Sequence, residues 1–174
     1  MTKVDPFVTE DGSSTLFSKQ YNQYYHNPNG ALSESQTVFI DRLNIQEHLK
    51  VHNGQLRIFE MGFGTGLNLL AALALWRESN QSGKLHFTSF EAFPMAPKDM
   101  LAAQAAFPAL AALSAELAPH WTAGKTAFET DDLVFTLILG DARNTVSNMA
   151  QKADAWFLDG FSPAKNPELW EPAL

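Results

Sequence analysis

Leu56-Arg57-Ile58-Phe59 leads directly into Glu60-Met61-Gly62-Phe63-Gly64-Thr65-Gly66, and the apolar run from Leu67 to Trp76 follows. The first segment is typical of a buried strand and the last of a helix. Glycines between them allow positive φ angles and let a ligand approach the backbone without meeting a Cβ atom. The first N–H groups of the helix point at the same place. The sequence therefore predicts a strand, a glycine-rich turn and a helix that together form a nucleotide-binding corner.

Segments of strand and helix character alternate after this corner. Apolar runs bounded by turn residues predict strands, and proline and glycine mark helix ends, with Pro119 expected to stop one helix. Repeated βα alternation with nearly continuous apolar strands predicts an α/β fold, Rossmann-like, with a doubly wound and mostly parallel sheet. We expect strands over Leu56 to Met61, Leu85 to Ala92 and Ala155 to Leu158, a hairpin of Lys125 to Glu129 with Leu133 to Leu139, and helices over Thr65 to Glu78, Pro97 to Gln104, Ala109 to Leu117 and Asp141 to Met149.

The two ends of the chain differ from this pattern. The first residues are rich in Ser, Asn, Gln and aromatics and end at the turn Asn27-Pro28-Asn29-Gly30, and residues 31–49 have helical spacing after a Ser cap. We therefore divide the chain into an N-terminal extension with a helical segment, 1–53, and a core, 54–174, in one compact domain overall. Prolines crowd the C-terminal end after only about four core strands, whereas a doubly wound sheet usually has more. We expect a sheet that lacks its last strands.

Composition excludes several classes of function. The chain has 174 residues, no cysteine and a formal net charge of −7, so neither a disulfide framework nor a cysteine metal site is expected. The negative charge disfavours non-specific binding of polyanions. The histidines show no metal-ligand spacing, and no apolar run is long enough for a bilayer or a signal peptide. We expect a cytoplasmic protein with no metal ion and no membrane partner.

The glycine-rich run narrows the choice of nucleotide. A dinucleotide fingerprint places its third glycine one residue later than Gly66, where Leu67 stands here. The acidic Glu60 would repel a pyrophosphate but attract the ammonium group of an amino acid. S-adenosylmethionine carries that ammonium group, a sulfonium and no phosphate. We therefore expect S-adenosylmethionine to bind at Glu60, Gly62, Gly64 and Gly66. The alternative is a structural turn that only starts a helix.

The next two strand ends fit the same ligand. Glu91 closes the second strand and is placed for bidentate contact with the two ribose hydroxyls. Asp141 and Ala142, after Gly140, are placed to meet the exocyclic amine of adenine. Ligands of open α/β sheets lie outside the carboxyl ends of the strands, where all three sites fall. The order of these sites supports the cofactor interpretation more than the glycines alone do.

Three segments carry a resemblance to a known family. Residues 154–170, which read Asp-Ala-Trp-Phe-Leu-Asp-Gly-Phe-Ser-Pro-Ala-Lys-Asn-Pro-Glu-Leu-Trp, closely resemble the methyltransferase part of the MnmC family and its stand-alone relative MnmD. Residues 30–39 and 59–68 are similar to the same family. The resemblance implies a class I methyltransferase that uses S-adenosylmethionine to methylate the aminomethyl group of a wobble 2-thiouridine in tRNA. It also implies a tRNA anticodon loop as partner and a separate FAD-dependent enzyme that forms the amine, with no flavin on this chain.

The end of the last predicted strand suggests how an amine is handled. A primary amine must be neutral before its lone pair attacks a methyl group, and Asp159 is well placed to orient the amine and take its proton. Gly160, Phe161, Ser162 and Pro163 resemble the loop by which amino-directed methyltransferases position a nitrogen. Phe161 is a candidate to stack on the base, or else a core residue of a turn.

Other interpretations stay open. Lys165 is a candidate contact for a phosphate of the anticodon loop, or simply a solvated side chain. Trp170 packs the loop or stacks a base. A methyltransferase of small amines suits the acidic charge better than a tRNA enzyme does. A third alternative is a non-catalytic module of this family that binds the cofactor without turnover.

Overall fold

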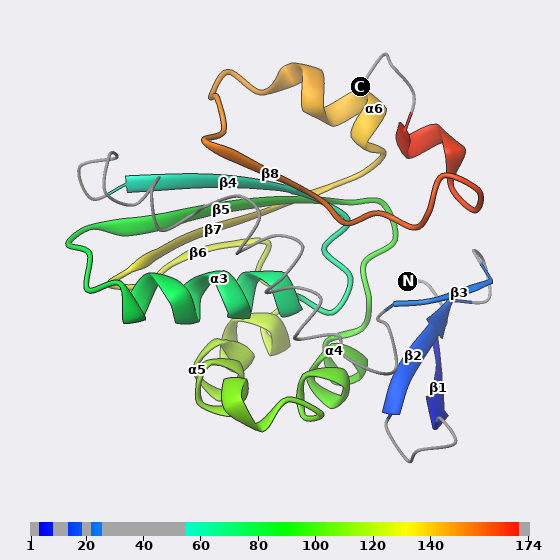
Figure 1. The fold of residues 1–174 in the computed structure, drawn as a ribbon, viewed down its shortest axis with the longest axis horizontal. Helices are drawn as coiled ribbons and strands as arrows, with labels where there is room; N and C mark the ends of the chain where they lie inside the picture. The colour runs from blue at the N-terminus through cyan, green and yellow to red at the C-terminus, as the bar shows by residue number, and fades with distance from the viewer. Residues whose placement is uncertain (1–3, 9–13, 19–21, 26–54, 171–174) are drawn as a thin grey trace.

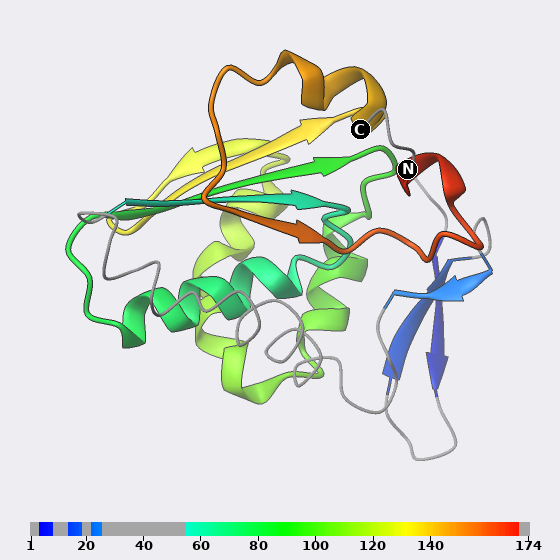
Figure 2. The same ribbon diagram turned by 45° about the horizontal axis from the view of Figure 1, so that its top comes forward.

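A computed structural model describes residues 4–8, 14–18, 22–25 and 55–170 of the chain (Figures 1 and 2). The helices predicted within 31–49 and the turn at 27–30 lie outside these residues. The division of the chain at residue 53 stays a prediction. Within the described part the predicted α/β architecture is confirmed, with a mostly parallel central sheet.

The central sheet has five strands in the order β6-β7-β5-β4-β8. Strand β4 pairs with β5 on one side and β8 on the other, both in parallel, and β5 pairs in parallel with β7. Only β6 runs antiparallel, as the first arm of the predicted hairpin. The strands are β4 (Gln55–Met61), β5 (Lys84–Glu91), β6 (Ala127–Glu129), β7 (Leu133–Leu139) and β8 (Ala155–Leu158).

Helices cover both faces of this sheet. In Figure 1, α3, α4 and α5 lie below it, and α6 lies above it. The chain therefore winds from β4 outward to β7 on one side, then crosses the opposite face and returns to pair β8 with β4. This reversal of direction makes β4 and β8 the switch point, where doubly wound folds bind ligands. The helices are α3 (Leu67–Glu78), α4 (Pro97–Gln104), α5 (Ala111–Thr122) and α6 (Ala142–Thr145), with 3-10 turns η2 (Pro108–Leu110), η3 (Val146–Asn148) and η4 (Pro167–Trp170).

The core lies between the sheet and helices α3 and α5. Strand β4 and helix α3 are buried along most of their length, because both pack between other elements. Aromatic rings fill the space under β7, where Trp121 meets Phe63, Phe128 and Phe135 with ring centroids 5.0–5.7 Å apart. Burial of such large apolar rings is the main favourable term in folding.

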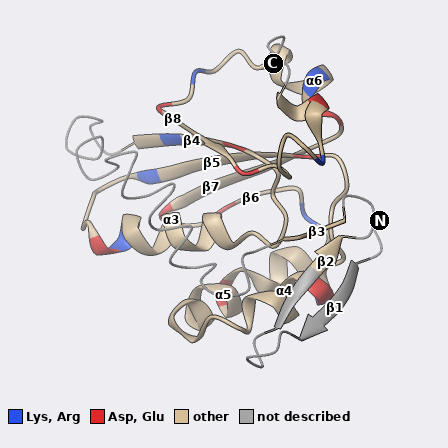
Figure 3. Cartoon of the chain, turned by 45° about the vertical axis from the view of Figure 1, so that its right-hand side comes forward, with Lys and Arg blue, Asp and Glu red and all other residues tan. Residues whose placement is uncertain are grey.

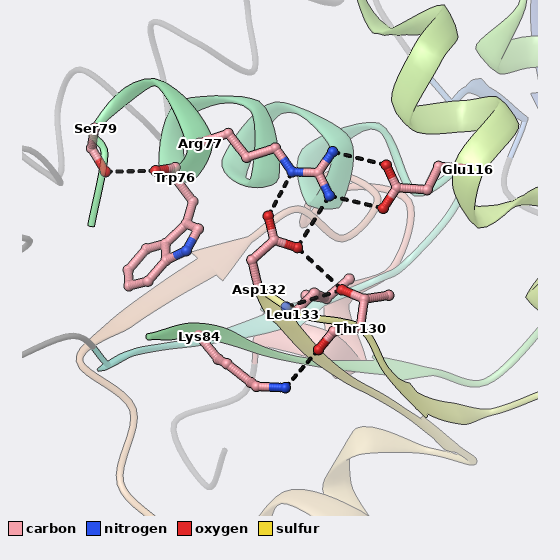
Figure 4. A network of polar contacts seen from close by, with 8 residues as sticks. All are labelled: Trp76, Arg77, Ser79, Lys84, Glu116, Thr130, Asp132 and Leu133. Atoms are coloured by element: carbon pink, nitrogen blue, oxygen red, sulfur yellow. Dashed lines mark hydrogen bonds and ion pairs between the residues drawn. The ribbon is translucent and has the colours of Figure 1, made fainter. Parts of the chain in front are cut away.

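Polar contacts tie the helices to the far end of the sheet (Figure 4). The Arg77 guanidinium near the end of α3 donates to both oxygens of Glu116 on α5 and to both oxygens of Asp132 in the β6–β7 turn. Lys84 at the start of β5 donates to the Thr130 carbonyl of the same turn. These pairs hold α3, α5 and the hairpin together at the edge of the sheet opposite the strands' carboxyl ends.

Two helix predictions were wrong at their ends. Helix α5 continues through Pro119 to Thr122 instead of stopping at Leu117, since Leu117 and Trp121 are both buried and the Ala123 N–H closes the last turn on the Pro119 carbonyl. The predicted helix over Asp141 to Met149 is one α-helical turn, α6, followed by the 3-10 turn η3. The other helices and strands predicted within residues 55–170 are confirmed to within a few residues at their ends.

The N-terminal residues form a small sheet that the sequence did not reveal. Strands β1 (Val4–Val8), β2 (Ser14–Ser18) and β3 (Gln23–Tyr24) pair antiparallel in that order. Phe17 on β2 faces Tyr24 on β3, with ring centroids 5.1 Å apart. In both ribbon views this sheet lies beside the carboxyl ends of the central strands and near η4 (Figures 1 and 2).

Charges of both signs are scattered over the described elements, as Figure 3 shows, without a large field of one sign. No single helix among the described residues is long and apolar enough to cross a membrane. One pair of helical segments, α4 and η2–α5, has the length and composition of a membrane span, and the two segments are bent by 115° relative to each other.

Candidate active site

The carboxyl ends of four strands meet along one edge of the sheet. The chain leaves β4, β5, β7 and β8 at neighbouring positions, because Met61 is in register with both Phe90 and Leu158, and Glu91 with Leu139. Hydrogen bonds between backbone groups continue this alignment beyond the strands: the Gly62 N–H donates to Phe90, the Gly140 N–H to Glu91 and the Asp159 N–H to Met61. The edge therefore brings together all the segments predicted to form the site.

The glycine-rich loop after β4 has the backbone shape that the sequence predicted. Gly62, Gly64 and Gly66 have φ angles of +89°, +52° and +73°, a range that residues with a Cβ rarely adopt. Gly66 is the N-cap of α3, and its N–H donates to the Phe63 carbonyl at 2.8 Å. The loop thus turns the chain sharply from the strand into the helix.

All three glycines also stand close to other backbone or side-chain atoms, Gly66 to the Phe63 ring. A Cβ atom at Gly62 would lie 3.1 Å from the Asp159 carbonyl oxygen, and one at Gly64 would lie 3.4 Å from the Tyr25 ring. The loop is therefore closely packed against the end of β8 and against the N-terminal segment. This tight, bare backbone beside a helix N-terminus fits an amino acid–nucleoside ligand such as S-adenosylmethionine.

Glu60 lies behind the loop, wholly buried at the end of β4. One of its oxygens accepts a hydrogen bond from Asn68 Nδ2 at 2.9 Å and the other from Ser89 Oγ at 2.6 Å. Loss of water raises the pKa of the Glu60 carboxyl well above its ordinary value; the Asp159 charge adds to this effect, and the bonds from Ser89 and Asn68 oppose it. Direct contact between Glu60 and an ammonium group stays a prediction.

Asn68 joins the two halves of the site. It stands in the first turn of α3 and is 5% exposed. Its Nδ2 donates to Glu60 on one side and to Asp159 Oδ2, at 2.6 Å, on the other. Asp159 is exposed at the end of β8, so its carboxylate is held at the edge where a substrate can reach it. This arrangement suits a group that exchanges protons with a bound molecule.

Glu91 and Asp141 lie on the other side of the loop. The Glu91 carboxylate accepts the Gly64 N–H at 3.2 Å and the Phe93 N–H at 2.7 Å, and a carboxylate with two such bonds can still accept others. Asp141 is the N-cap of α6 and accepts the Arg143 N–H. The Arg143 guanidinium also binds both its oxygens, and this pairing lowers the pKa of the Asp141 carboxyl. Ala142 is buried directly after it.

The loop after Asp159 is folded back on itself. The Lys165 N–H and the Asn166 N–H both donate to the Ser162 carbonyl, and Trp170 Nε1 donates to the Phe161 carbonyl at 2.9 Å. Trp170 therefore contacts the loop in the way the packing alternative expected, although 39% of it stays exposed. Pro163 and Lys165 are exposed at the tip.

Phe161 and Ser162 contact the N-terminal segment. The Phe161 ring meets the Tyr25 ring edge to face, with centroids 5.2 Å apart. Ser162 donates from both its N–H and its hydroxyl to Gln23 Oε1, at 3.2 and 3.1 Å. Phe161 is thus half-buried against another aromatic ring and not part of the central core. Gln23 was not a predicted site residue, and Tyr25 was considered as a stacking surface but assigned to packing.

Among the described residues, no group of three or more His, Asp or Glu side chains is arranged to hold a metal ion. Asn68 and Ser89 are two further polar residues that the sequence analysis did not assign to the site. Both stand within apolar segments and are buried, and a polar residue in such a place needs a partner. That signal could have drawn attention to them.

Comparison with known proteins finds several to which this chain is similar. A family model described as S-adenosyl-L-methionine-dependent methyltransferase matches residues 108–174. The tRNA 5-methylaminomethyl-2-thiouridine biosynthesis bifunctional protein MnmC of Burkholderia mallei is 40% identical over 177 residues, covering 95% of this chain and 26% of that protein. The protein of the same name from Burkholderia pseudomallei is 39% identical over 180 residues, with 95% and 27% covered. Over 95% of its length this chain is similar to the methyltransferase part of MnmC.

A solved structure supports the same relationship. The crystal structure of MNMC2 from Aquifex aeolicus matches this fold with a TM-score of 0.73 and 33% identity, covering 98% of this chain and 53% of that one. The resemblance to MnmC seen in the sequence is therefore confirmed. The chain spans about a quarter of the length of the curated MnmC proteins, 26% in the first comparison.

Proposed function

We propose that this chain transfers a methyl group from S-adenosylmethionine to the aminomethyl nitrogen of 5-aminomethyl-2-thiouridine at the tRNA wobble position. The observation that carries the proposal is the Asn68 bridge, which sets the Asp159 carboxylate directly beside the glycine loop at the switch point of the sheet. The methyltransferase family model supports the donor. The names of the MnmC relatives support the acceptor.

S-adenosylmethionine, when bound, supplies a methyl group on a positively charged sulfur. We assign its binding to the glycine loop at Gly62, Gly64 and Gly66 and to the neighbouring strand ends. Glu91 reaches the same loop through the Gly64 N–H and retains acceptor capacity for ribose hydroxyls. Asp141 and Ala142, one strand further along, lie at the adenine side. Glu60 supports the loop from behind through Asn68.

Asp159 acts on the acceptor. An alkylammonium has no lone pair, so the nitrogen must lose a proton before a carbon–nitrogen bond can form. The exposed carboxylate accepts that proton and keeps its bond from Asn68, which fixes its orientation. Gly160 to Pro163 position the nitrogen, and Phe161 supplies an aromatic surface for the base. Lys165, exposed at the tip of the loop, is placed to meet a phosphate of the anticodon loop.

The test is methyl transfer to tRNA that carries the unmethylated aminomethyl nucleoside, measured by mass spectrometry of the digested nucleosides. We expect one methyl group to be gained at the wobble nucleoside. Asp159→Asn is expected to slow transfer about 100-fold or more, with binding of S-adenosylmethionine by calorimetry retained. Asp154→Asn is the matched control, because Asp154 stands directly before the first residue of β8, at the end away from Asp159. Its carboxylate accepts the Arg57 N–H, which an amide oxygen can also accept.

Three results would count against this function. An Asp159→Asn variant that methylates at the wild-type rate would remove Asp159 from the reaction. Methylation of a panel of small amines, without methylation of tRNA, would favour the small-amine alternative. Tight binding of S-adenosylmethionine with no turnover on either acceptor would favour a non-catalytic binding module.

The proposed reaction also implies partners and a place. An FAD-dependent or other amine-forming enzyme must supply the aminomethyl nucleoside, and the curated relatives are named as bifunctional proteins. A tRNA substrate places the protein in the cytoplasm. Both statements are parts of the proposal.

A further inference from the structure

The N-terminal segment Gln23–Tyr25 lies across both halves of the candidate site. Gln23 accepts two hydrogen bonds from Ser162, and Tyr25 contacts the Phe161 ring. The Tyr25 ring also lies 3.4 Å from the point where a Cβ atom on Gly64 would stand. Gln23 stands in β3 and Tyr25 directly follows the strand, and both side chains contact the 160–163 loop. Tyr24 points the other way and packs on Phe17 within the small sheet.

This arrangement is more than packing of a surface strand. One short segment touches two loops of the site, the glycine loop on the donor side and the 160–163 loop on the acceptor side. The two loops are about a hundred residues apart in sequence, and Ser162 is 139 residues from Gln23. The small sheet β1–β3 anchors the segment, because Ser18 on β2 is buried and pairs in register with Gln23.

We propose that Gln23 and Tyr25 are positioning and specificity-determining residues for the acceptor nucleobase. Gln23 fixes Ser162, and thereby the loop that presents the nitrogen. Tyr25 and Phe161 form an edge-to-face aromatic pair, and a planar pyrimidine base is the kind of ligand that such a surface binds by stacking. This inference rests on the proposed function for the identity of the acceptor, but the loop contact itself does not depend on it.

The loop contact is tested first, without any substrate. Hydrogen exchange of the Ser162 amide is measured in the full chain and in Gln23→Ala. Loss of the bond is expected to speed its exchange about tenfold, since one hydrogen bond contributes about that factor. The Thr130 amide is the internal control, because it donates to the Leu133 carbonyl in the β6–β7 turn, away from this loop. Equal exchange of the Ser162 amide in both proteins would overturn the proposal.

The acceptor role is tested by binding of an anticodon stem-loop RNA that carries the aminomethyl nucleoside. Tyr25→Ala and Gln23→Ala are each expected to weaken RNA binding about tenfold, raise the KM for RNA more than they lower kcat, and leave the Kd for S-adenosylmethionine within about threefold. Tyr24→Phe is the matched control and should change none of these.

The outcomes separate this inference from the proposed function. RNA binding that is unchanged in Tyr25→Ala and Gln23→Ala would overturn it while the enzyme remains a tRNA methyltransferase. Equal weakening of donor and RNA binding would also overturn it, because the segment would then be merely structural. If the wild-type chain binds no RNA, the proposed function fails. The further inference is refuted on its own by either of two results. One is an unchanged KM of both variants for an aromatic amine acceptor, and the other is a Ser162 amide whose exchange is unaffected by Gln23→Ala.

Discussion

Substitution of Gly62 by Ala tests whether the glycine loop is shaped by close approach as well as by backbone angle. Gly62 has a φ of +89°, and an added Cβ would stand 3.1 Å from the Asp159 carbonyl oxygen and 3.4 Å from the Gly160 Cα. The positive φ costs an L-residue about 1–2 kcal/mol. The atoms that the added Cβ would meet belong to the backbone and cannot rotate away, so overpacking adds about 1–3 kcal/mol to the cost of the substitution. We expect Gly62→Ala to lose roughly 2–5 kcal/mol of unfolding free energy.

Gly124 provides the matched control. Its φ is +67°, and nothing lies within 4 Å of an added Cβ, so Gly124→Ala carries the backbone strain alone, about 1–2 kcal/mol. The effect of Ala on the unfolded chain is the same in both variants and cancels in the comparison. Both are measured by urea unfolding followed by tryptophan fluorescence, and donor binding by calorimetry. Because Gly62 belongs to the loop that we assign to S-adenosylmethionine, Gly62→Ala alone should weaken donor binding, about tenfold. Equal stability and equal donor affinity in the two variants would refute this explanation of the loop.

Three further predictions concern the core, a surface network and a buried carboxyl. Trp121 Nε1 has no hydrogen-bond partner among the described residues, so Trp121→Phe should cost less than about 1.5 kcal/mol, against about 3–5 kcal/mol for Trp121→Ala, in urea unfolding; equal costs would contradict it. Arg77 lowers the pKa of the Asp132 carboxyl, so the pair stabilises the fold above the unfolded pKa of about 4 and the effect disappears as the pH falls through the folded value. Asp132→Asn should therefore flatten the acid side of the stability profile, by no more than about 1 kcal/mol for so exposed a pair, and parallel profiles would argue against it. Burial raises the pKa of the Glu60 carboxyl, so the stability contributed by its protonated form is complete below the unfolded pKa and is lost as the pH rises through the folded value. Glu60→Gln should therefore gain stability relative to wild type as the pH rises. A difference in unfolding free energy that stays constant across that range would rule this out.

The central sheet and the glycine loop were predictable because local sequence determines them. Strand β8 is a continuous apolar run and β4 is apolar at most of its buried positions, as buried parallel strands require. The positive φ angles at Gly62, Gly64 and Gly66 follow from a sharp turn between a strand and a helix. The positions of Glu91 and Asp159 along one edge followed from the parallel order of the strands. These features need no knowledge of distant contacts.

The N-terminal sheet could not be predicted in the same way. Strand β1 contains Pro6, and a proline within a run argues against a strand. The structure tolerates it because β1 is the outer strand of its sheet. Pro119 misled the analysis in the opposite sense, since buried Leu117 and Trp121 hold the last turn of α5 in place. In both cases tertiary packing decided against the local preference of a proline.

The donor and acceptor sides of the site are one polar unit, and Asn68 is the reason. Its single amide NH₂ group has two protons, and each is donated to a different carboxylate, Glu60 behind the glycine loop and Asp159 at the exposed edge. The Asp159 charge also raises the pKa of Glu60, while the bond from Asn68 opposes that rise. The glycine-rich sequence that defines the fold and the Asp-Gly-Phe-Ser-Pro segment a hundred residues later are thus coupled by the first polar side chain of the helix between them.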